Sequence, residues 1–484
     1  MKHVHRIFAS RRASLGGAAF AALGLLSACA AGPDYQRPSA PTPALYKEAP
    51  GAAAAWFPAA PADALDKGEW WTLFGDDDLN ALIRQVDVSN QNVAAAVAAY
   101  AQARALVRED RAALFPNLGL SGSAARSGGR GVATTGNRLQ LAADASWAPD
   151  VWGRLGRTIE AAQANAAASA ADLAAARLSA QGLLATDYFA LRDADAELAL
   201  LRSTVAGFER TLKITSNRYA AGIAAKTDVL QAQTQLASTR SDLSTLQGQR
   251  AQLEHAIAVL VGKSPGELTL PVAAWKMNVP AVPLGVPSTL LQRRPDIAAA
   301  ERAVAAANAQ IGVQQSAYYP SLTLSSSLGS TATSVSRLFD ASNMLWSLGL
   351  SAAQTLFDAG AIRARVEGAE ASRDAAIARY RQTVLSAFQA VEDQLAQTRA
   401  LTEQADLRLE ASQAADLTEE QFLNRYLQGQ VAYTEVVTAQ ATALNARRTL
   451  AKLASSRQAS AIALIQALGG GWHGEGAGGS ERYR

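Results

Sequence analysis

Few side chains in this sequence could carry out chemistry. After the basic segment at its start, the chain of 484 residues holds one cysteine, Cys29, and two histidines, His255 and His473. They supply neither a zinc-binding spacing nor a cysteine–histidine pair for nucleophilic catalysis. Residues 262–264, Gly-Lys-Ser, end like a phosphate-binding loop, but Ile257 stands where that motif needs its first glycine. We therefore expect no catalytic residues, no metal site and no enzyme activity.

The cysteine carries one candidate reaction, the attachment of a lipid. A basic start and an apolar run over 15–26 precede Leu-Ser-Ala-Cys at 26–29, which is the order of an export signal. This tetrapeptide resembles the bacterial lipobox, in which the thiol receives diacylglycerol and the cysteine becomes the first residue of the mature protein. Ala30 in place of an aspartate favours sorting to the outer membrane. We expect a covalent lipid on Cys29 and no other cofactor.

The overall charge excludes one class of partner. The formal net charge is +3, but four positive side chains and no acids lie in 1–28, so subtracting them leaves a mature chain near −1. A nearly neutral chain gives no reason to expect binding to nucleic acid. After Cys29 the sequence has no run of about eighteen apolar residues, so a membrane-spanning helix is not expected. If the mature chain crosses a bilayer, strands must cross it.

The sequence contains an internal repeat. Arg-Tyr-x-x-Gly at 218–222 recurs at 425–429, which is 207 positions later. A duplication of this length leaves about two hundred residues for each copy, so one helix-and-strand unit is used two times. Further pairs at this offset are Asp228 with Glu435, Gln233 with Gln440, and Arg240 with Arg447.

Each copy contains two short segments of alternating polarity. In the first segment, Leu118 and Leu120 share one face and Ser121 lies on the other. A membrane strand explains this alternation, and so does a soluble sheet with one buried face. The predicted strands cover about 117–126, 137–149, 321–329 and 344–356, and rings suited to a membrane interface lie at their ends: Phe115, Trp147, Tyr318, Tyr319 and Trp346.

Helical patterns surround the strands. A helix is expected from capping carboxylates at 76–78 to about Leu114, and two helices of about sixty residues, about 90 Å each, follow Gly153 and Gly360. Their apolar three-four spacing predicts coiled coils with closely packed, alanine-rich seams. Arg250 and Arg457 occupy one seam position in the two copies, and we expect them to pair with acids or to extend toward solvent.

Four strands cannot enclose a space, so membrane strands would require assembly. Two copies would give eight strands and a filled interior, whereas three would give twelve strands and an open, hydrated one. The polar strand faces favour three copies. The predicted organisation is a signal peptide at 1–28, an extended tether at 29–68, a first repeat at 69–262, a linker at 263–287, a second repeat at 288–468, and a glycine-rich tail at 469–484.

Two motifs resemble those of a known family. Arg293-Arg294-Pro295-Asp296-Ile297, continuing through Glu301, Asn308 and Gly312 to Tyr319-Pro320-Ser321-Leu322, resembles the signature of the TolC-like outer membrane efflux proteins. Together with Gly32-Pro33-Asp34-Tyr35-x-x-Pro38, it is similar to the lipoprotein outer membrane factors of RND-type tripartite pumps, the NodT and OprM type. The resemblance covers nearly the whole mature chain.

The resemblance implies a homotrimer with a twelve-stranded barrel in the outer membrane and a helical tunnel in the periplasm. It also implies a closed tunnel tip, opened by a periplasmic adaptor protein that links it to an inner-membrane RND pump. The tip would carry a ring of carboxylates, which assigns Glu435 and, less directly, Asp228 to the gate. The adaptor would dock on Arg218, Tyr219, Gly222, Arg425, Tyr426 and Gly429.

Simpler interpretations compete with these assignments. The two glycines suit a left-handed turn, Thr227 and Thr434 can cap the helices that follow, and the acids in the first turns can be helix-stabilising only. A duct for type I protein secretion and a periplasmic coiled-coil scaffold without a pore are the rival functions. The lipobox and Arg-Arg-Pro-Asp-Ile favour a passive duct of the RND type that exports small molecules.

Overall fold

The computed structural model describes residues 31–40, 43, 46–48, 69–128, 136–273, 275–280, 282 and 294–470. The predicted signal peptide, Cys29, Arg293 and all but the start of the predicted tail lie outside these residues. The described chain forms two compact units. One contains residues up to 39 with 99–170 and 299–381, and the other contains 40–98, 171–298 and 382–470.

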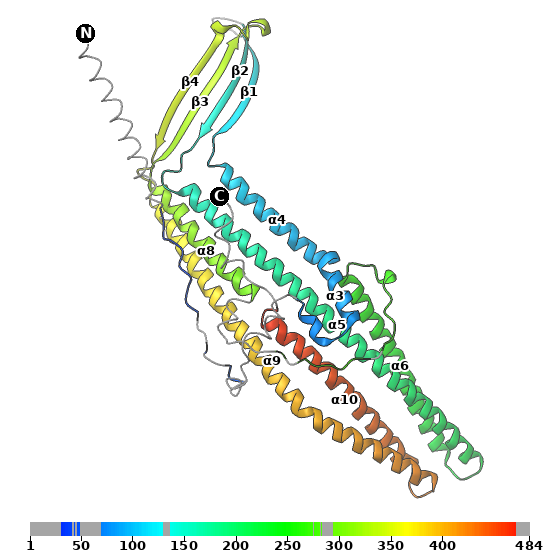
Figure 1. The fold of residues 1–484 in the computed structure, drawn as a ribbon. Helices are drawn as coiled ribbons and strands as arrows, with labels where there is room; N and C mark the ends of the chain where they lie inside the picture. The colour runs from blue at the N-terminus through cyan, green and yellow to red at the C-terminus, as the bar shows by residue number, and fades with distance from the viewer. Residues whose placement is uncertain are drawn as a thin grey trace, which may run out of the picture. The chain divides into compact units, whose positions relative to one another are not determined.

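Each repeat passes from helix through two strands into two long helices (Figure 1). This order confirms the predicted helix-strand-strand-helix duplication. The first repeat contains α3 (Asp77–Ser89), α4 (Gln91–Ala112), β1 (Asn117–Ser127), β2 (Gly136–Trp147), α5 (Arg154–Ala220) and α6 (Lys226–Leu260). The second contains α8 (Pro295–Gln315), β3 (Ser321–Ala332), β4 (Met344–Ala353), α9 (Ala361–Leu427) and α10 (Tyr433–Ala467). Short 3-10 turns accompany them, η2 (Trp70–Phe74) and η3 (Pro265–Glu267) among them.

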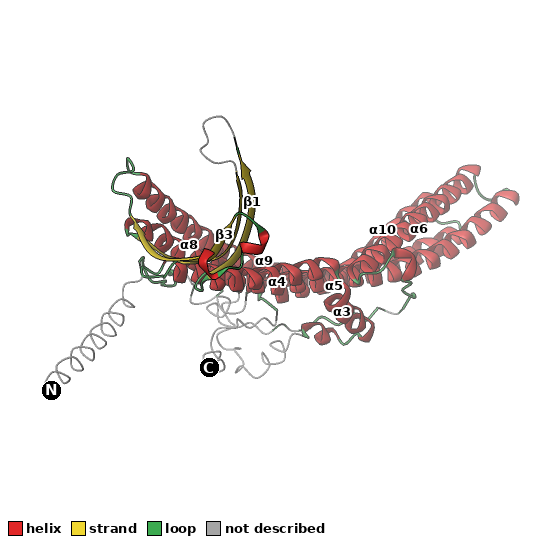
Figure 2. Cartoon of the chain, turned by 90° about the horizontal axis from the view of Figure 1, so that it is seen from above, coloured by secondary structure: helices red, strands yellow, loops and turns green. Residues whose placement is uncertain are grey.

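The strands form one antiparallel sheet in the order β1-β2-β3-β4, and Figure 2 shows that it is curved. Its register places apolar residues opposite one another, as in Leu120 against Ala143 and Leu324 against Leu350. Successive side chains in a strand point to opposite faces, so these pairs lie on one continuous face. The strands lie near the predicted segments, although β3 runs three residues further than 329 and β4 ends three residues before 356.

The predicted helix from 76 to 114 is two helices. Asp76 caps α3 as expected, because its carboxylate accepts from the backbone N–H groups of Asp78 and Leu79. Asn90 then interrupts the helix. Its side-chain oxygen accepts from two backbone N–H groups at the start of α4, and its amide donates to the carbonyl of Leu260 at 2.8 Å. The side chain thus caps a new helix in place of continuing the old one.

Among the described residues, an extensive apolar core lies in the second unit. Aromatic side chains from η2 and α5 pack together there, with the Phe74 and Phe189 ring centroids 5.0 Å apart. The Tyr188 hydroxyl donates to the Asp76 carboxylate at 2.9 Å, which satisfies the polar end of a buried ring. Among the described residues, no helix combines the length and apolar character needed to cross a membrane.

Candidate functional site

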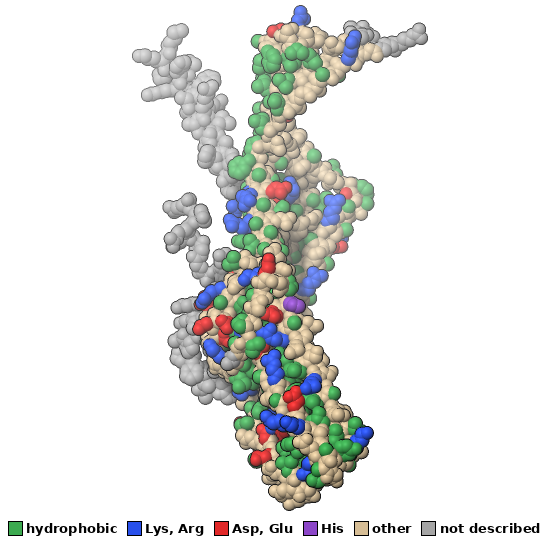
Figure 3. All heavy atoms as spheres, turned by 90° about the vertical axis from the view of Figure 1, so that its right-hand side faces the viewer, with side chains coloured by type: hydrophobic (Ala, Val, Ile, Leu, Met, Phe, Trp, Pro, Cys, Tyr) green, Lys and Arg blue, Asp and Glu red, His purple; other side chains and the backbone are tan. Residues whose placement is uncertain are grey.

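The sheet exposes its apolar face. Leu118 is 77% exposed and Trp346 is 78% exposed, although side chains of these types usually avoid water. The opposite face is polar: the Ser121 hydroxyl donates to the Asp144 carboxylate at 3.1 Å, and the hydroxyls of Ser327 and Ser347 are 3.2 Å apart. Figure 3 shows hydrophobic side chains gathered over one side of the sheet. An exposed apolar patch of this extent indicates a surface that meets lipid or another chain.

Aromatic rings stand at the strand ends, as the sequence predicts. Phe115 and Tyr319 are exposed near the start of β1 and β3, and Trp346 is exposed near the start of β4. The Trp147 indole N–H donates to the carbonyl of Leu114 at 2.9 Å. Rings with one polar atom suit the boundary between lipid and water.

Residues 32–35, near the start of the described chain, contact α8. Gly32 has a φ of +95°, and a Cβ there would lie 2.4 Å from the Cα of Gly312. Beside this contact the Asn308 amide donates to the carbonyl of Pro33 at 2.8 Å, and the Tyr35 hydroxyl donates to Glu301 at 2.6 Å. The extended tether over 29–68 stays a prediction, and the structure adds that residues 32–35 of it contact α8.

The buried side chain of Arg157 holds the same segment. Its guanidinium donates to the carbonyls of Ala31 and Gly32 and to the carboxylates of Asp34 and Glu160, the last two at 2.8 and 2.7 Å. Burial alone would lower the pKa of Arg157, but the hydrogen bonds to the two carboxylates raise it, so the side chain stays charged. One arginine of α5 thus fixes the chain just after the predicted lipid site.

Arg294 and Asp296 of the predicted signature form hydrogen bonds at the start of α8 and at the end of α10. Pro295 begins α8, where a missing N–H costs nothing, and the Asp296 carboxylate accepts from the Ile297 N–H at 2.9 Å. Arg294 donates to both oxygens of Asp296 and, at 2.8 Å, to the carbonyl of Ala467 at the end of α10. These described residues of the signature are structural.

The two Arg-Tyr-x-x-Gly motifs form the turns between the long helices. Gly222 and Gly429 have φ values of +73° and +75°, and in each turn the glycine N–H and the next N–H donate back to the motif's tyrosine and arginine carbonyls. This is the glycine-ended helix stop that the sequence predicts. The predicted caps are wrong, because α6 and α10 begin after Ala225 and Ala432, so Thr227 and Thr434 lie inside the helices.

The first turn contacts the second. The Arg218 guanidinium donates to the carbonyl of Leu427 at 2.9 Å and lies 4.9 Å from the centre of the Tyr426 ring. Tyr426 and Tyr433 are buried there, with ring centroids 5.2 Å apart. Burial, the Tyr426 ring and the charge of Asp228 raise the pKa of Tyr433 to about 12, so Tyr433 stays neutral. The structure therefore brings Arg218 and Tyr426 of the predicted tip residues into contact.

The remaining predicted tip residues differ in exposure. Glu435 is exposed in the first turn of α10, and Asp228 is half-buried in the first turn of α6. Tyr219 is 46% exposed, whereas its counterpart Tyr426 is 4% exposed. Arg425 lies over the Phe422 ring of its own helix, with 6.0 Å between its guanidinium carbon and the ring centre.

The comparison with known families accounts for this architecture. Residues 82–263 and 286–470 match the family described as Outer membrane efflux protein. The chain belongs to that family. It is therefore an outer membrane transport protein built from two repeated halves, and it is not an enzyme.

Individual relatives extend the match over nearly the whole chain. The Cation efflux system protein CusC of Escherichia coli O6:H1 is 31% identical, over 92% of this chain and 96% of that protein. The Probable outer membrane lipoprotein SilC of Salmonella typhimurium is 28% identical, over 93% and 97%. The solved structure of the outer-membrane channel OprN has a TM-score of 0.80 and 30% identity, over 92% of this chain and all of that one.

This efflux protein also contains ion pairs between helices that sequence reasoning missed. Arg240 of α6 donates to Glu209 of α5 at 2.6 Å, and Arg447 of α10 donates to Asp416 of α9 at 2.8 Å. The two pairs are equivalent at an offset of 207 positions. Each helical hairpin, α5 with α6 in the first repeat and α9 with α10 in the second, thus has this ion pair between its helices. The sequence shows the duplicated arginines, but it does not show which acids they pair with.

The seam arginine of the first repeat is held in an ionic network. Arg250 donates to Asp195 at 2.6 Å, to Glu254 at 3.2 Å and to the carbonyl of Leu270 at 2.7 Å. Asp195, which is 1% exposed, also accepts from the buried Arg192 at 3.1 Å. The prediction that Arg250 pairs with acids on neighbouring helices is confirmed.

Proposed function

We propose that three copies of this chain form the outer membrane duct of a tripartite RND-type efflux pump, through which small molecules leave the cell passively. The observation that carries the proposal is the four-stranded sheet with an exposed apolar face and a polar face. Within the described residues its edge strands β1 and β4 have no further partner strand. Lipid does not tolerate open edges, so the edges must pair with other copies, and twelve strands leave a hydrated interior.

The position of the N-terminal segment supports a lipid on Cys29. The Ala31 N–H donates to the carbonyl of Trp152 at 3.0 Å, and Trp152 lies five positions after the end of β2. Cys29 is two residues before Ala31, a span of about 7 Å at most. A lipid on Cys29 would thus start close to the strand ends with the interfacial rings.

The helical tips supply the gate and the adaptor site in this proposal. A threefold axis repeats the exposed Glu435 three times, and such a ring of carboxylates attracts cations and repels anions. Arg218 closes one hairpin onto the other, so the tip has a contact that an adaptor can displace. An adaptor that binds the open tip more tightly than the closed one shifts the population toward the open duct.

Adjacent residues of β4 test the membrane assignment. Leu348 and Ser347 point to opposite faces. Leu348→Arg places a charge in lipid at a cost of about 2–4 kcal/mol per chain, whereas Ser347→Arg places it in water. We expect the first variant to be lost from the outer membrane and from the trimer, measured by fractionation and cross-linking, and the second to assemble. Normal assembly of both variants would contradict a membrane sheet.

Single-channel recording tests the gate. Glu435→Gln should reduce the preference for cations in planar bilayers, because it removes one negative charge from each copy. Asp228→Asn is the matched control on the other hairpin, and we expect a smaller change from it. Unchanged conductance and selectivity in the Glu435 variant would leave that residue with a helix-stabilising role only.

A further inference from the structure

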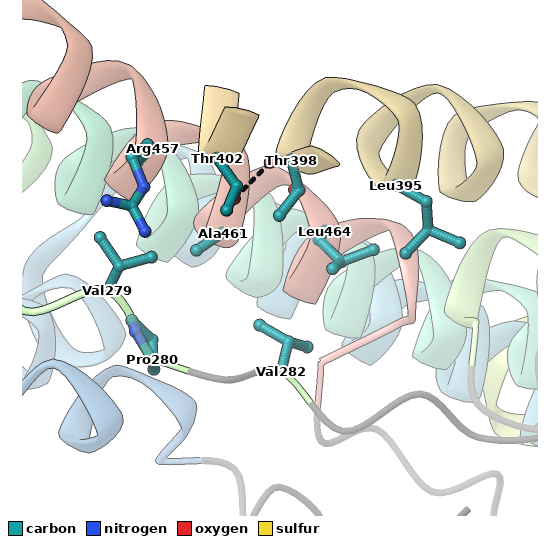
Figure 4. Close-up of a pocket in the computed structure, with 9 residues that line it drawn as sticks. All are labelled: Val279, Pro280, Val282, Leu395, Thr398, Thr402, Arg457, Ala461 and Leu464. Carbon is teal, nitrogen blue, oxygen red and sulfur yellow. Dashed lines mark hydrogen bonds between the residues drawn. The ribbon is translucent and has the colours of Figure 1, made fainter. Parts of the chain in front are cut away.

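A small cavity lies beside the second hairpin, where the inter-repeat linker crosses it. Its volume is about 230 Å³, and Figure 4 shows the residues that line it. For comparison, an engineered apolar cavity of about 150 Å³ is sufficient to bind benzene. The wall is apolar except for two threonines and one charge: it comprises Val279, Pro280, Val282, Leu395, Thr398, Thr402, Arg457, Ala461 and Leu464.

Arg457 is the charged residue of this wall, and Figure 4 shows it extending from α10 toward Val279. In the part of the chain that the structure describes, its guanidinium has no hydrogen-bond acceptor and no carboxylate partner. Glu435 is the one acid of α10, and it lies 22 positions before Arg457. Of the two predicted outcomes for the seam arginines, pairing with acids is not met at Arg457, which is partly exposed and lines the cavity.

The first repeat shows what this arginine has lost. At the 207-residue offset, Arg457 corresponds to Arg250, Thr402 to Asp195, and Ala461 to Glu254. Arg250 binds both of those carboxylates. The second repeat therefore keeps the cation, replaces both acids by uncharged residues, and has a cavity beside the cation.

We propose that this cavity binds a small hydrophobic carboxylic acid. The planar guanidinium of Arg457 would take the carboxylate through paired N–H donors, whereas Arg250 donates one N–H to each of the two acids of the first repeat. An aryl or short alkyl body would fill the space between Leu395, Leu464 and Val282. One positive charge in an apolar wall matches a monoanion, because a dianion would leave a charge uncompensated. The site does not depend on conduction through the duct.

Ligand-observed fluorine NMR on the full-length, detergent-purified protein tests the site with 4-fluorobenzoate. We expect saturable binding, with 4-fluorobenzamide, the neutral analogue, at least about tenfold weaker because it cannot form the ion pair. Arg457→Gln should weaken benzoate binding by about tenfold or more. Thr402→Asp should do the same, because it restores the first repeat's carboxylate beside Arg457 and so occupies the guanidinium internally.

Arg399→Gln is the matched control. Arg399 lies one turn from Thr402 on α9, but it already pairs with Glu48 at 2.7 Å, so its loss should leave benzoate binding unchanged. Thermal unfolding of every variant checks that the helices are intact. Equal affinity for the acid and the amide would overturn the proposal, as would unchanged binding after Arg457→Gln, or no saturation up to about 10 mM benzoate.

Discussion

The two hairpins share a backbone and differ in their contacts. Each pairs a helix of 67 residues with one of 35, and each turns at a glycine with nearly the same positive φ. At the tip, however, Arg218 reaches the other hairpin, while Arg425 stays on its own helix. The backbone of the duplicated unit has been kept, and the side chains that join the two copies have become different. One copy provides the contact and the other receives it.

The same division occurs at the seam. In the first repeat Arg250 closes a buried network of two arginines and two acids, and in the second Arg457 faces a cavity. Internal ion pairs thus hold the first hairpin together at Arg250, whereas a cavity lies at the equivalent position of the second hairpin. The difference implies that the residues around Arg250 stabilise the first repeat, and that the equivalent residues around Arg457 in the second repeat bind a ligand.

The largest expected effect comes from breaking the network of the first repeat. Asp195→Ala leaves Arg192 and Arg250 without their shared carboxylate, and breaking a buried pair in this way costs about 3–5 kcal/mol. Thr402→Ala, at the equivalent position of the second repeat, should change stability by about 0.5 kcal/mol or less, because Thr402 is exposed. Thermal unfolding of the purified variants, followed by circular dichroism, measures both. Similar melting temperatures of the two variants would show that the two repeats do not differ in stability at positions 195 and 402.

The second effect concerns the contact between the hairpins. Arg218→Ala removes a charged donor and a ring contact, which together hold the tip by about 1 kcal/mol at an exposed site. We expect about a fivefold increase in the open population, seen as higher open probability in planar bilayers. Arg425→Ala should leave gating unchanged, because Arg425 contacts its own helix. An equal response of both variants would remove the asymmetry between the tips.

Local patterns predicted most of the fold. Alternating residues predicted all four strands, and the Arg-Tyr-x-x-Gly repeat predicted both turns, because period and glycine act within a few residues. The wrong caps have a local cause too. After Gly222 and Gly429 the turn geometry starts the next helix after three more residues, before the threonines can cap it. The break at Asn90 had a signal, since asparagine favours the N-cap position.

Contacts between distant motifs could not be predicted. Tyr35 binds Glu301 across 266 positions, and the two motifs that carry these residues appeared separate in the sequence. Likewise, identical Arg-Tyr-x-x-Gly motifs gave no indication that Tyr426 is buried and Tyr219 is not. Burial depends on the packing of the two hairpins, which neither motif encodes alone.

The third effect is a pH dependence contributed by Asp193 of the first repeat. Burial and the neighbouring Glu197 carboxylate raise the pKa of Asp193 to about 6, against the opposing influence of Lys452 and Ser455. A raised carboxyl pKa opposes folding when the group is ionised, so stability should rise as pH falls from 7 to 5 and the folded protein takes up the proton. Partial solvent exposure limits the gain to about 1 kcal/mol.

Asp193→Asn should remove this part of the pH dependence, measured as the change in melting temperature between pH 7 and pH 5. The counterpart of Asp193 in the second repeat is Ala400, so that repeat provides no equivalent group. Asp187 and Glu419 also have raised pKa values because of burial, and the wild-type curve contains their contributions. An identical slope in the variant and the wild type would exclude Asp193 as a source.

The smallest effect concerns what the hairpins have in common. Arg447 binds both Asp416 and Glu419, whereas Arg240 binds Glu209 at a more exposed site. Exposed ion pairs contribute about 0.2–1 kcal/mol, so Arg240→Ala should cost less than Arg447→Ala, and both less than Asp195→Ala. Salt separates electrostatic from packing contributions: about 1 M sodium chloride should reduce both losses, because exposed charges are screened. If Arg240→Ala proved as costly as Asp195→Ala, stability would reside in the shared hairpin pairs and not in the network of the first repeat.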